Sequence, residues 1–301
     1  MKILVTGANG FVGQALTGRL SEAGHEIVAA IGPVGEAAKG EQKTESVELD
    51  LTKRESVADV GERPYDAVIH LAGVASGADA RSNPRAAWEI NTVGTALLCE
   101  NLASGRESAG SDPVVLVVST SEVYGIGSAK PRKEEDDVLP TSIYAASKLG
   151  AEIASLEVHR RTGLKVIIAR AFPHSGAGQD SRFVLPVFAS RILAAKATGG
   201  QRVRVGNLAV TRELLHVTDV VDAYARLVAS GSIGEVYNVA SGKGVTLSEL
   251  FRMIARKVGY EPAPDLDPEL LRDGEIPHLV GDGSKLKAAT GWVPTILPEQ
   301  T

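Results

Sequence analysis

Two short segments carry side chains suited to proton transfer. Tyr144 and Lys148 lie four residues apart in TSIYAASKLGAEIAS, which reads as a helix, so both fall on one face. Upstream, the apolar run VVLVVST is followed by SE, which places Thr120 and Glu122 at the end of a predicted strand. A phenol, an ammonium, a hydroxyl and a carboxylate brought together could move protons between substrate and protein. Tyr and Lys at this spacing are common in helices, so the surroundings must decide.

A glycine-rich turn near the start of the chain indicates a dinucleotide site. ILVTGANGFVG places Gly7, Gly10 and Gly13 directly after an apolar run and at the mouth of a helix. One glycine permits the tight turn, one lets a pyrophosphate approach backbone N–H groups, and one allows close packing of helix on strand. Near a positively charged nicotinamide and the Lys148 ammonium, the phenolate of Tyr144 is favoured. Tyr144 could then exchange a proton with a sugar hydroxyl while hydride moves.

The residues that usually choose between NAD and NADP leave that choice open. A carboxylate after the second strand favours NAD and a basic residue favours NADP. Here residues 29–32 are Ala, Ala, Ile and Gly, and Glu36 and Lys39 lie too far along the loop to decide. Asp50, followed by Leu51 at the end of the third predicted strand, has two interpretations. Its carboxylate accepts from an adenine amino group, or it is the N-cap of the next helix.

The strands and helices that must position these residues alternate regularly along the sequence. Six apolar runs, at 2–6, 26–31, 46–50, 67–71, 114–119 and 165–170, alternate with helix-length segments. This pattern predicts an α/β protein with a doubly wound parallel sheet of the Rossmann type. After residue 170 we expect helices at 183–197, from 218 and at 247–258, with short strands at 202–205 and 236–239.

Because the regular alternation of strands and helices ends near residue 170, we expect the chain to have two parts. We expect residues 1–170 to form a dinucleotide-binding domain, which also receives returns from about 208–240. Residues 171–301 should form mainly a smaller C-terminal lobe that holds a substrate over the carboxyl ends of the strands.

Composition excludes several classes of function. The 301 residues include 32 Lys and Arg against 37 Asp and Glu, a net charge of −5, and no basic run is interleaved with aromatic residues. Nucleic acid and anionic membranes are therefore not expected as partners. No apolar stretch approaches the length of a membrane span, and glycines interrupt the first segment where a signal peptide would be continuous. The single cysteine, Cys99, fits a reducing compartment; we expect a cytoplasmic protein without a metal site.

Taken in order, these signatures resemble those of the extended short-chain dehydrogenases/reductases that act on nucleotide sugars, the NAD-dependent epimerase/dehydratase family. They are TGANGFVG at 6–13, DL at 50–51, HLAG at 70–73, NTVGT at 91–95, STSEVYG at 119–125 and YAASK at 144–148. The second half is most similar to reductases of GDP-4-keto-6-deoxy sugars, through ARAFPHSGAGQ, VGNLAVTRELLHVTDVVDAY, GEVYNVASG and LRDGEIPHLVGDGSKLKAATGW.

The resemblance implies NAD or NADP as cofactor, a nucleotide sugar as substrate, and a homodimer formed through the catalytic helix and its neighbour. It assigns acid/base chemistry to Tyr144. Lys148 would bind the nicotinamide ribose and lower the tyrosine pKa, and Thr120 would hydrogen-bond the sugar O4. The other cofactor contacts that it implies are Gly7, Gly10, Phe11, Val12, Gly13, Asp50, Leu51, Leu71, Ala72, Asn91 and Ala171; the substrate contacts are His174, Arg212, Arg272 and Glu275.

Three positions depart from the family pattern. Pro173 stands where an asparagine is common, Ala171 where a proline is, and Glu213 where an aspartate follows the arginine. His174 is therefore a candidate replacement for the lost amide contact. A guanidinium fork suits Arg212 to a diphosphate, although a surface ion pair with Glu213 or a neighbour is the alternative. His70 and His216 are interpreted as structural residues.

The expected reaction is reduction of the 4-keto group of an NDP-4-keto-6-deoxyhexose by NAD(P)H, with a GDP-linked substrate favoured. Hydride would reach C4, and Tyr144 would protonate the developing alkoxide. A 4-epimerase or a 4,6-dehydratase would use the same residues and return the hydride to the sugar. Glu122 would remove the C5 proton in a dehydratase, or simply cap the following turn. A noncatalytic dinucleotide-binding sensor is the alternative of another class, against which Thr120, Tyr144 and Lys148 argue.

Overall fold

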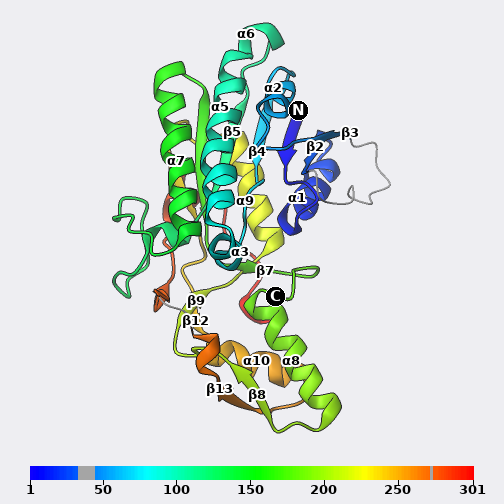
Figure 1. The fold of residues 1–301 in the computed structure, drawn as a ribbon, viewed down its shortest axis with the longest axis vertical. Coiled ribbons are helices and arrows are strands. Elements are labelled where there is room, and N and C mark those ends of the chain that lie inside the picture. The colour runs from blue at the N-terminus through cyan, green and yellow to red at the C-terminus, as the bar shows by residue number, and fades with distance from the viewer. Residues whose placement is uncertain (33–44, 272–273) are drawn as a thin grey trace.

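The computed structural model describes residues 1–32, 45–271 and 274–301. Within these ranges the largest element is a parallel sheet of seven strands in the order β11-β6-β5-β4-β1-β2-β3 (Figure 1). The strands are β1 (Lys2–Thr6), β2 (Glu26–Ile31), β3 (Glu45–Glu48), β4 (Ala67–His70), β5 (Val114–Thr120), β6 (Lys165–Ala171) and β11 (Val236–Val239). The predicted doubly wound α/β fold is confirmed. The seventh strand, β11, comes from the second half of the chain.

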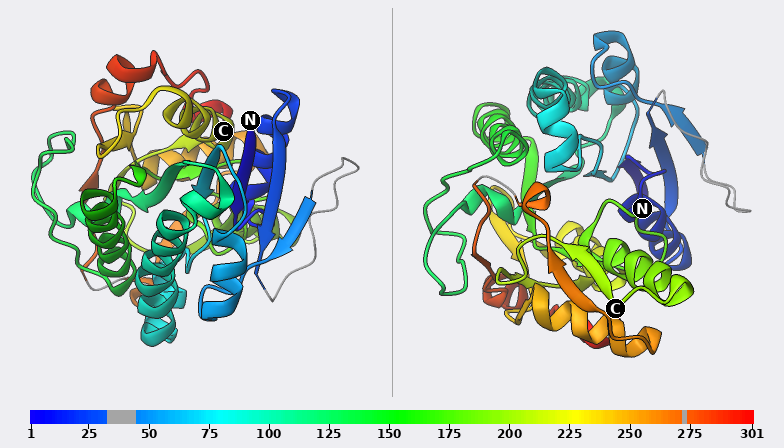
Figure 2. Two further views of the ribbon diagram at one scale, coloured as in Figure 1. Left: turned by 90° about the horizontal axis from the view of Figure 1, so that it is seen from above. Right: turned by 60° about the horizontal axis from the view of Figure 1, so that its bottom comes forward.

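Helices cover both faces of this sheet, as Figure 2 shows from above. One face packs against α1 (Phe11–Glu22), α9 (Val217–Ser230) and α11 (Ser284–Thr290). The other packs against α2 (Arg54–Gly61), α5 (Thr95–Ser104) and α7 (Ile143–Thr162). Because neither face meets water, the inner strands are apolar throughout and not alternating, which is why their runs were easy to recognise.

The chain order reverses at β1, and this reversal locates the crevice where a ligand can bind. β1 pairs in parallel with β2 on one side and with β4 on the other. The connections that leave the carboxyl ends of β1 and β4 therefore diverge to opposite faces of the sheet. In open α/β sheets, ligands bind outside the carboxyl ends of the strands at such a point. The glycine turn after β1 and the HLAG segment after β4 both lie there.

The second half adds smaller elements below the carboxyl edge of the large sheet (Figure 1). The helices α8 (Val184–Thr198) and α10 (Leu247–Val258) and the strand β8 (Arg202–Val205) share an apolar core, and β8 pairs with β13 (Ala263–Leu266). β9 (Thr211–Glu213) lies between β12 (Gly244–Thr246) and β14 (His278–Leu279), and β7 (His174–Ser175) pairs with β10 (Leu215–His216).

The remaining elements are short. They are α3 (Gly77–Ser82), α4 (Pro84–Trp88), η1 (Glu89–Gly94), α6 (Arg106–Ala109), η2 (Ser121–Tyr124), η3 (Pro268–Leu270) and η4 (Pro298–Gln300). η1 is a π-helical turn between α4 and α5. Among the described residues, no helix is long and apolar enough to cross a bilayer.

Candidate active site

The glycine turn leaves no room for side chains at two of its three positions. Gly7 has a φ of 67°, and a Cβ there would lie 3.0 Å from the Ala72 nitrogen. A Cβ at Gly13 would lie 2.1 Å from the Gly7 oxygen. Gly10 is the N-cap of α1, and no side chain caps the N-terminus of this helix. The free N–H groups at residues 11–13 can therefore face an anion such as a pyrophosphate.

A chain of buried hydrogen bonds fixes the backbone after β4. The Thr95 hydroxyl donates to the Asn91 carbonyl (2.6 Å), so it must accept from His70 Nε2 (2.9 Å). His70 Nδ1 then accepts from the Thr6 hydroxyl (2.8 Å). Thr6 Oγ1 in turn accepts the N–H groups of residues 71 and 72 (3.1 and 3.0 Å). This network supports the structural interpretation of His70 and holds the predicted contacts Leu71 and Ala72 beside Gly7.

Burial of this network keeps the His70 ring neutral. The ring is 1% exposed. Its burial, together with the nearby charge of Lys148, lowers the pKa of His70 to about 3. A neutral imidazole with one donor and one acceptor nitrogen is the form that these hydrogen bonds require.

Asn91 lies in the π-helical turn, where its side chain is engaged with other parts of the protein; the expected cofactor contact stays a prediction. Its side chain is buried, with Oδ1 accepting from the Val74 N–H (2.8 Å). Its Nδ2 donates to the Val74 carbonyl (3.2 Å) and to Ser147 Oγ (2.9 Å). Both amide hydrogens and the carbonyl are thus engaged with the protein. Asn91 joins the loop after β4 to the helix α7 and has no donor left for a ligand.

Thr120, Tyr144 and Lys148 come together at the carboxyl edge of the sheet. Thr120 ends β5, and its hydroxyl shares a hydrogen bond with the Tyr144 phenol. Tyr144 lies in the first turn of α7, whose N-cap Ser142 accepts the Ala145 N–H (3.1 Å). Lys148 follows one turn later on the same helix and is 8% exposed. The acid/base set expected from sequence is therefore one cluster.

The surroundings of Tyr144 set the pKa of its phenol. Burial raises the pKa of Tyr144, the negative charge of Glu122 raises it further, and the hydrogen bond with Thr120 acts in the opposite direction. Burial and Glu122 outweigh the hydrogen bond with Thr120, and the expected lowering of this pKa by Lys148 stays a prediction. The protein itself therefore holds Tyr144 as a neutral phenol, which is the form that donates a proton.

The Lys148 ammonium is positioned for a ligand. Its Nζ lies 3.9 Å from where a Cβ of Gly73 would be, beside the loop after β4. Burial lowers the pKa of Lys148 to about 8, against the opposing influence of Glu152. No hydrogen bond or ion pair within 4 Å joins this ammonium to the residues that the structure describes. Its three N–H donors can therefore bind hydroxyl groups of a ligand.

The carboxylate of Asp50 is held by the two residues that follow Leu51. Its Oδ1 accepts from the backbone N–H and hydroxyl of Thr52 (3.0 and 2.6 Å), and Oδ2 lies 3.2 Å from Lys53 Nζ. The N-cap interpretation is wrong, since α2 begins at Arg54 and its N-cap is Lys53. The contact of Asp50 with adenine stays a prediction. Leu51 is buried, close enough to Gly94 that a Cβ on the glycine would lie 2.7 Å from the leucine Cβ.

His174 lies over the glycine turn. Its ring stacks on Phe11, with centroids 6.5 Å apart and an interplanar angle of 9°. His174 Nδ1 donates to the Phe172 carbonyl (2.9 Å), so Nε2 is left as an acceptor. Burial lowers the pKa of this ring. The preceding Ala171 pairs with Thr120 across β5 and β6, which places it at the same edge.

Arg212 and Glu275, two of the predicted substrate contacts in the second half of the chain, lie on neighbouring segments. Arg212 in β9 donates through Nη1 to the carbonyl of Ile276 (2.7 Å), the residue after Glu275. β14 pairs with β9, so these segments, some 60 residues apart in sequence, lie side by side. The carboxylate of Glu213 instead accepts the N–H groups of Ser241 and Gly281 in the interior. Arg272 lies outside the described residues.

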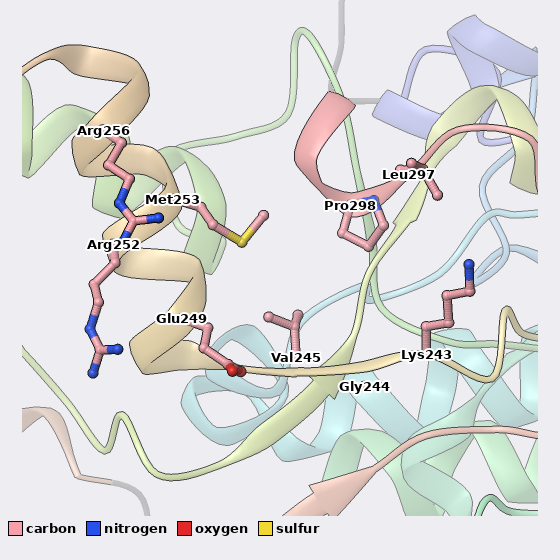
Figure 3. Close-up of a pocket in the computed structure, with 9 residues that line it drawn as sticks. All are labelled: Lys243, Gly244, Val245, Glu249, Arg252, Met253, Arg256, Leu297 and Pro298. Carbon is pink, nitrogen blue, oxygen red and sulfur yellow. The ribbon is translucent and has the colours of Figure 1, made fainter.

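A separate groove of about 420 Å³ lies between α10, β12 and the last residues of the chain (Figure 3). Lys243, Arg252 and Arg256 give it a basic rim, and Met253 and Pro298 contribute apolar surface. None of the predicted site residues lines this groove. Among the described residues there is also no cluster of three or more His, Cys, Asp or Glu side chains able to hold a metal ion.

Sequence reasoning missed a buried ion pair beside the site. Arg170 Nη2 lies 2.8 Å from Glu152 Oε2, with side chains 7% and 3% exposed. Ser119 Oγ donates to the same carboxylate (2.5 Å). The signal was present: Arg170 ends the buried run VIIAR, and a charged residue in such a strand needs a partner.

Comparison with known proteins agrees with this geometry. The model of the NAD dependent epimerase/dehydratase family matches residues 3–240. GDP-6-deoxy-D-mannose reductase of Pseudomonas aeruginosa is 34% identical, covering 100% of this chain and 94% of the relative. The structure of RMD from Pseudomonas aeruginosa complexed with NADPH has a TM-score of 0.83 and 35% identity, covering 99% and 95% of the two chains. UDP-glucose 4-epimerase from Thermotoga maritima with UDP-glucose has a TM-score of 0.89 and 26% identity, covering 100% and 96%.

The match extends over both halves of the chain. The expected nicotinamide dinucleotide and the expected enzyme class agree with the description of the matching family. The chain belongs to the NAD dependent epimerase/dehydratase family of extended short-chain dehydrogenases/reductases.

Proposed function

We propose that the chain is an NAD(P)-dependent oxidoreductase that reduces the 4-keto group of an NDP-4-keto-6-deoxyhexose, with a GDP-linked substrate favoured. Similarity to a GDP-6-deoxy-D-mannose reductase along the whole chain supports this substrate class. The observation that carries the proposal is the position of Tyr144 beside Thr120 at the carboxyl edge of the sheet, one helical turn before Lys148. Its phenol keeps its proton at neutral pH, and a ketone reduction needs such a donor at the oxygen that becomes a hydroxyl.

The residues at the switch point fit a nicotinamide dinucleotide. The uncapped N-terminus of α1 and the glycines before it would hold the pyrophosphate, and Asp50 would accept from the adenine amino group. Lys148 would bind the nicotinamide ribose through its free ammonium donors. When bound, the reduced dinucleotide supplies the hydride that adds to C4 of the sugar.

The chain's own residues then complete the reduction. The Tyr144 hydroxyl donates its proton to the oxygen on C4, where the former carbonyl has become an alkoxide. Thr120 hydrogen-bonds at the same oxygen and keeps the phenol oriented through the contact that they share. The Lys148 ammonium stabilises the phenolate that remains on Tyr144. One hydride and one proton convert the ketone to the alcohol.

The nucleotide end of the substrate is proposed to lie against the second half of the chain. Arg212 and Glu275 lie on adjacent segments, and Arg212 would meet the diphosphate while Glu275 accepts from ribose hydroxyls. Arg272 would add a second cation. His174 offers Nε2 as an acceptor above the glycine turn, in place of the amide that the family commonly has there.

A 4,6-dehydratase is the second candidate, and one observation favours it. The charge of Glu122 acts directly on Tyr144, so its carboxylate lies near the reacting phenol, where it could remove the C5 proton. A dehydratase or a 4-epimerase regenerates its dinucleotide in each cycle, whereas a reductase consumes it.

The absorbance of the reduced dinucleotide at 340 nm therefore separates these reactions. The protein is mixed with NADPH or NADH and with GDP-, UDP- or dTDP-linked 4-keto-6-deoxyhexoses. In parallel it is mixed with NAD⁺ or NADP⁺ and the corresponding nucleotide hexoses, which are the substrates of an epimerase or a dehydratase. We expect stoichiometric oxidation with a GDP-linked ketone, and a loss of about 10²-fold or more in kcat for Tyr144→Phe. Turnover without net oxidation would replace the reductase by an epimerase or dehydratase. Binding without turnover of any sugar would favour a sensor.

We also propose that the enzyme is a cytoplasmic homodimer. Trp88, Val93 and Ile153 are 44%, 51% and 59% exposed, on α4, η1 and α7, and these elements pack side by side. Exposed large apolar side chains on neighbouring helices are typical of a subunit interface. Sedimentation of the wild type and of Ile153→Arg tests this: the variant should sediment as a monomer. The buried thiol of Cys99 agrees with a reducing compartment.

A further inference from the structure

The chain buries a carboxylate one helical turn beyond Lys148. Glu152 is 2% exposed, and its Oε1 accepts from Ser119 Oγ (2.5 Å) and Arg170 Nε (3.1 Å). Its Oε2 accepts from Arg170 Nη2 (2.8 Å). Removing two charges from water costs about as much as their attraction returns. Stability alone therefore does not explain why such a pair lies beside the reacting groups.

The carboxylate connects the two elements that carry the reacting side chains. Ser119 and Arg170 are register partners on β5 and β6, and both reach Glu152 on α7. Ser119 directly precedes Thr120, and Glu152 follows Lys148 by four residues. A shift of α7 along the sheet would therefore break the hydrogen bonds of Glu152 to Ser119 and Arg170.

Glu152 is also the anion that acts on Lys148. Among the described residues, the titratable groups whose interaction with this ammonium is resolved are Glu152 on its own helix and His70 from β4, and Tyr144 lies one turn before it on α7. His70 is neutral, since its pKa is about 3, and Tyr144 is a neutral phenol. Burial lowers the pKa of Lys148 to about 8, and the charge of Glu152 opposes this lowering. Arg170 carries the opposite charge and pairs with this carboxylate at 2.8 Å.

We propose that Glu152 is a positioning residue for the reduction proposed above, on which this inference rests. Its buried carboxylate keeps the Lys148 ammonium charged at neutral pH and ties the strand end that bears Thr120 to α7. Arg170 and Ser119 hold the carboxylate in place.

The test is the pH dependence of dinucleotide binding, measured by the fluorescence of NADPH or NADH between pH 6 and 9.5 with no sugar present. Glu152→Gln keeps the shape of the side chain and removes its charge. We expect the alkaline midpoint of binding to move down by about one pH unit, the size of effect that an adjacent opposite charge produces. At pH 8 this shift lowers the charged fraction of Lys148, and hence the affinity, by about fivefold.

Two further variants make this result specific. Glu157→Gln removes an exposed carboxylate from the same helix, where it pairs with Arg161, and should leave the midpoint unchanged. If Glu152→Gln does not fold, the double variant Glu152→Leu/Arg170→Met removes both charges together, a change that buried pairs tolerate. It should show a downward shift smaller than that of Glu152→Gln, because removal of the Arg170 cation offsets part of the loss of the carboxylate.

A folded Glu152→Gln chain with the wild-type midpoint and affinity would overturn the proposal. So would a shift of equal size in Glu157→Gln. The shift in Glu152→Gln together with absence of sugar reduction by the wild type would retain the role of Glu152 and overturn only the proposed function. Failure of the wild-type chain to bind either dinucleotide would overturn both.

Discussion

Ion pairs occur in two very different surroundings in this chain. Beneath α7, the side chains of Glu152 and Arg170 are 3% and 7% exposed and share hydrogen bonds with Ser119 and Tyr124. On the outer ribbon of β8 and β13, Arg202 pairs with Asp265 while 72% and 45% of these side chains remain exposed. Exposed pairs contribute little to stability, whereas a buried charge without its partner is costly. We therefore expect the stability of the fold to depend on the buried ion pair beside the site and to depend little on the exposed pair of the ribbon.

Breaking the buried pair should have the largest effect on stability. Arg170→Met leaves Glu152 as an unpaired charge in the interior, and we expect the free energy of unfolding to fall by about 3–5 kcal/mol. Urea denaturation followed by circular dichroism measures this loss, with Arg202→Met on the ribbon as the matched control. A loss below about 1 kcal/mol for Arg170→Met would show that the two regions do not differ in the way described.

Two glycines of α1, the buried Gly13 and the exposed Gly18, also differ in their surroundings. A Cβ at Gly13 would meet the Gly7 oxygen at 2.1 Å and the Ala8 Cα at 2.7 Å. A Cβ at Gly18 would meet no atom of the surrounding protein within 4 Å. Gly13→Ala should therefore destabilise the chain by about 1–3 kcal/mol and weaken dinucleotide binding. Gly18→Ala should stabilise it by about 0.5–1 kcal/mol without changing affinity. Equal effects of the two substitutions would contradict the tight packing of the glycine turn.

The buried His70 ring should make the stability of the fold depend on pH. The pKa of His70 falls from 6.5 to about 3 on burial, so below pH 6.5 the unfolded chain binds a proton that the folded chain excludes. The stability associated with the neutral ring is present above pH 6.5 and is lost as the pH falls. Between pH 7 and pH 5 this loss amounts to about 2 kcal/mol.

The measurement is the free energy of unfolding in urea at pH 7, 6 and 5 for the wild type, His70→Gln and His25→Gln. The acid-dependent loss should disappear from His70→Gln, although this variant starts from a lower stability because it interrupts the network from Thr6 to Asn91. His25 lies outside that network, and its variant should keep the wild-type slope. An unchanged slope in His70→Gln would assign the proton to another group.

Much of the fold could be predicted because local signals and burial coincide. Strands covered on both faces leave uninterrupted apolar runs, and the bounds of β1 and β2 agree with those expected. The glycine turn was recognisable because Gly7 and Gly13 are required by backbone contacts within one βα unit. The proximity of Tyr144 to Lys148 follows from helical spacing alone.

The remaining features depend on contacts between distant segments. The π-helical turn at Glu89–Gly94 lies where Gly94 packs on Leu51, a contact that no local pattern encodes. The partners of the Asn91 side chain, Val74 and Ser147, come from two other segments. The raised pKa of Tyr144 arises from burial and from Glu122, which is 22 positions earlier in the sequence. Helical spacing identified the ammonium beside Tyr144 and could not identify the carboxylate.

The smallest effect is expected on the ribbon itself. Arg204 reaches both Asp267 and Glu269, yet 65% of its side chain and 83% of that of Glu269 are exposed, so water and salt compete for these contacts. We expect Arg204→Gln to leave Tm within about 1 °C of the wild type at physiological ionic strength, and to remove no dinucleotide affinity. Thermal melts in 0.05 M and 0.5 M salt check this, because any small difference should vanish at the higher concentration. A loss that persists in high salt would mean that the ribbon pairs are structural in the same sense as Glu152 and Arg170.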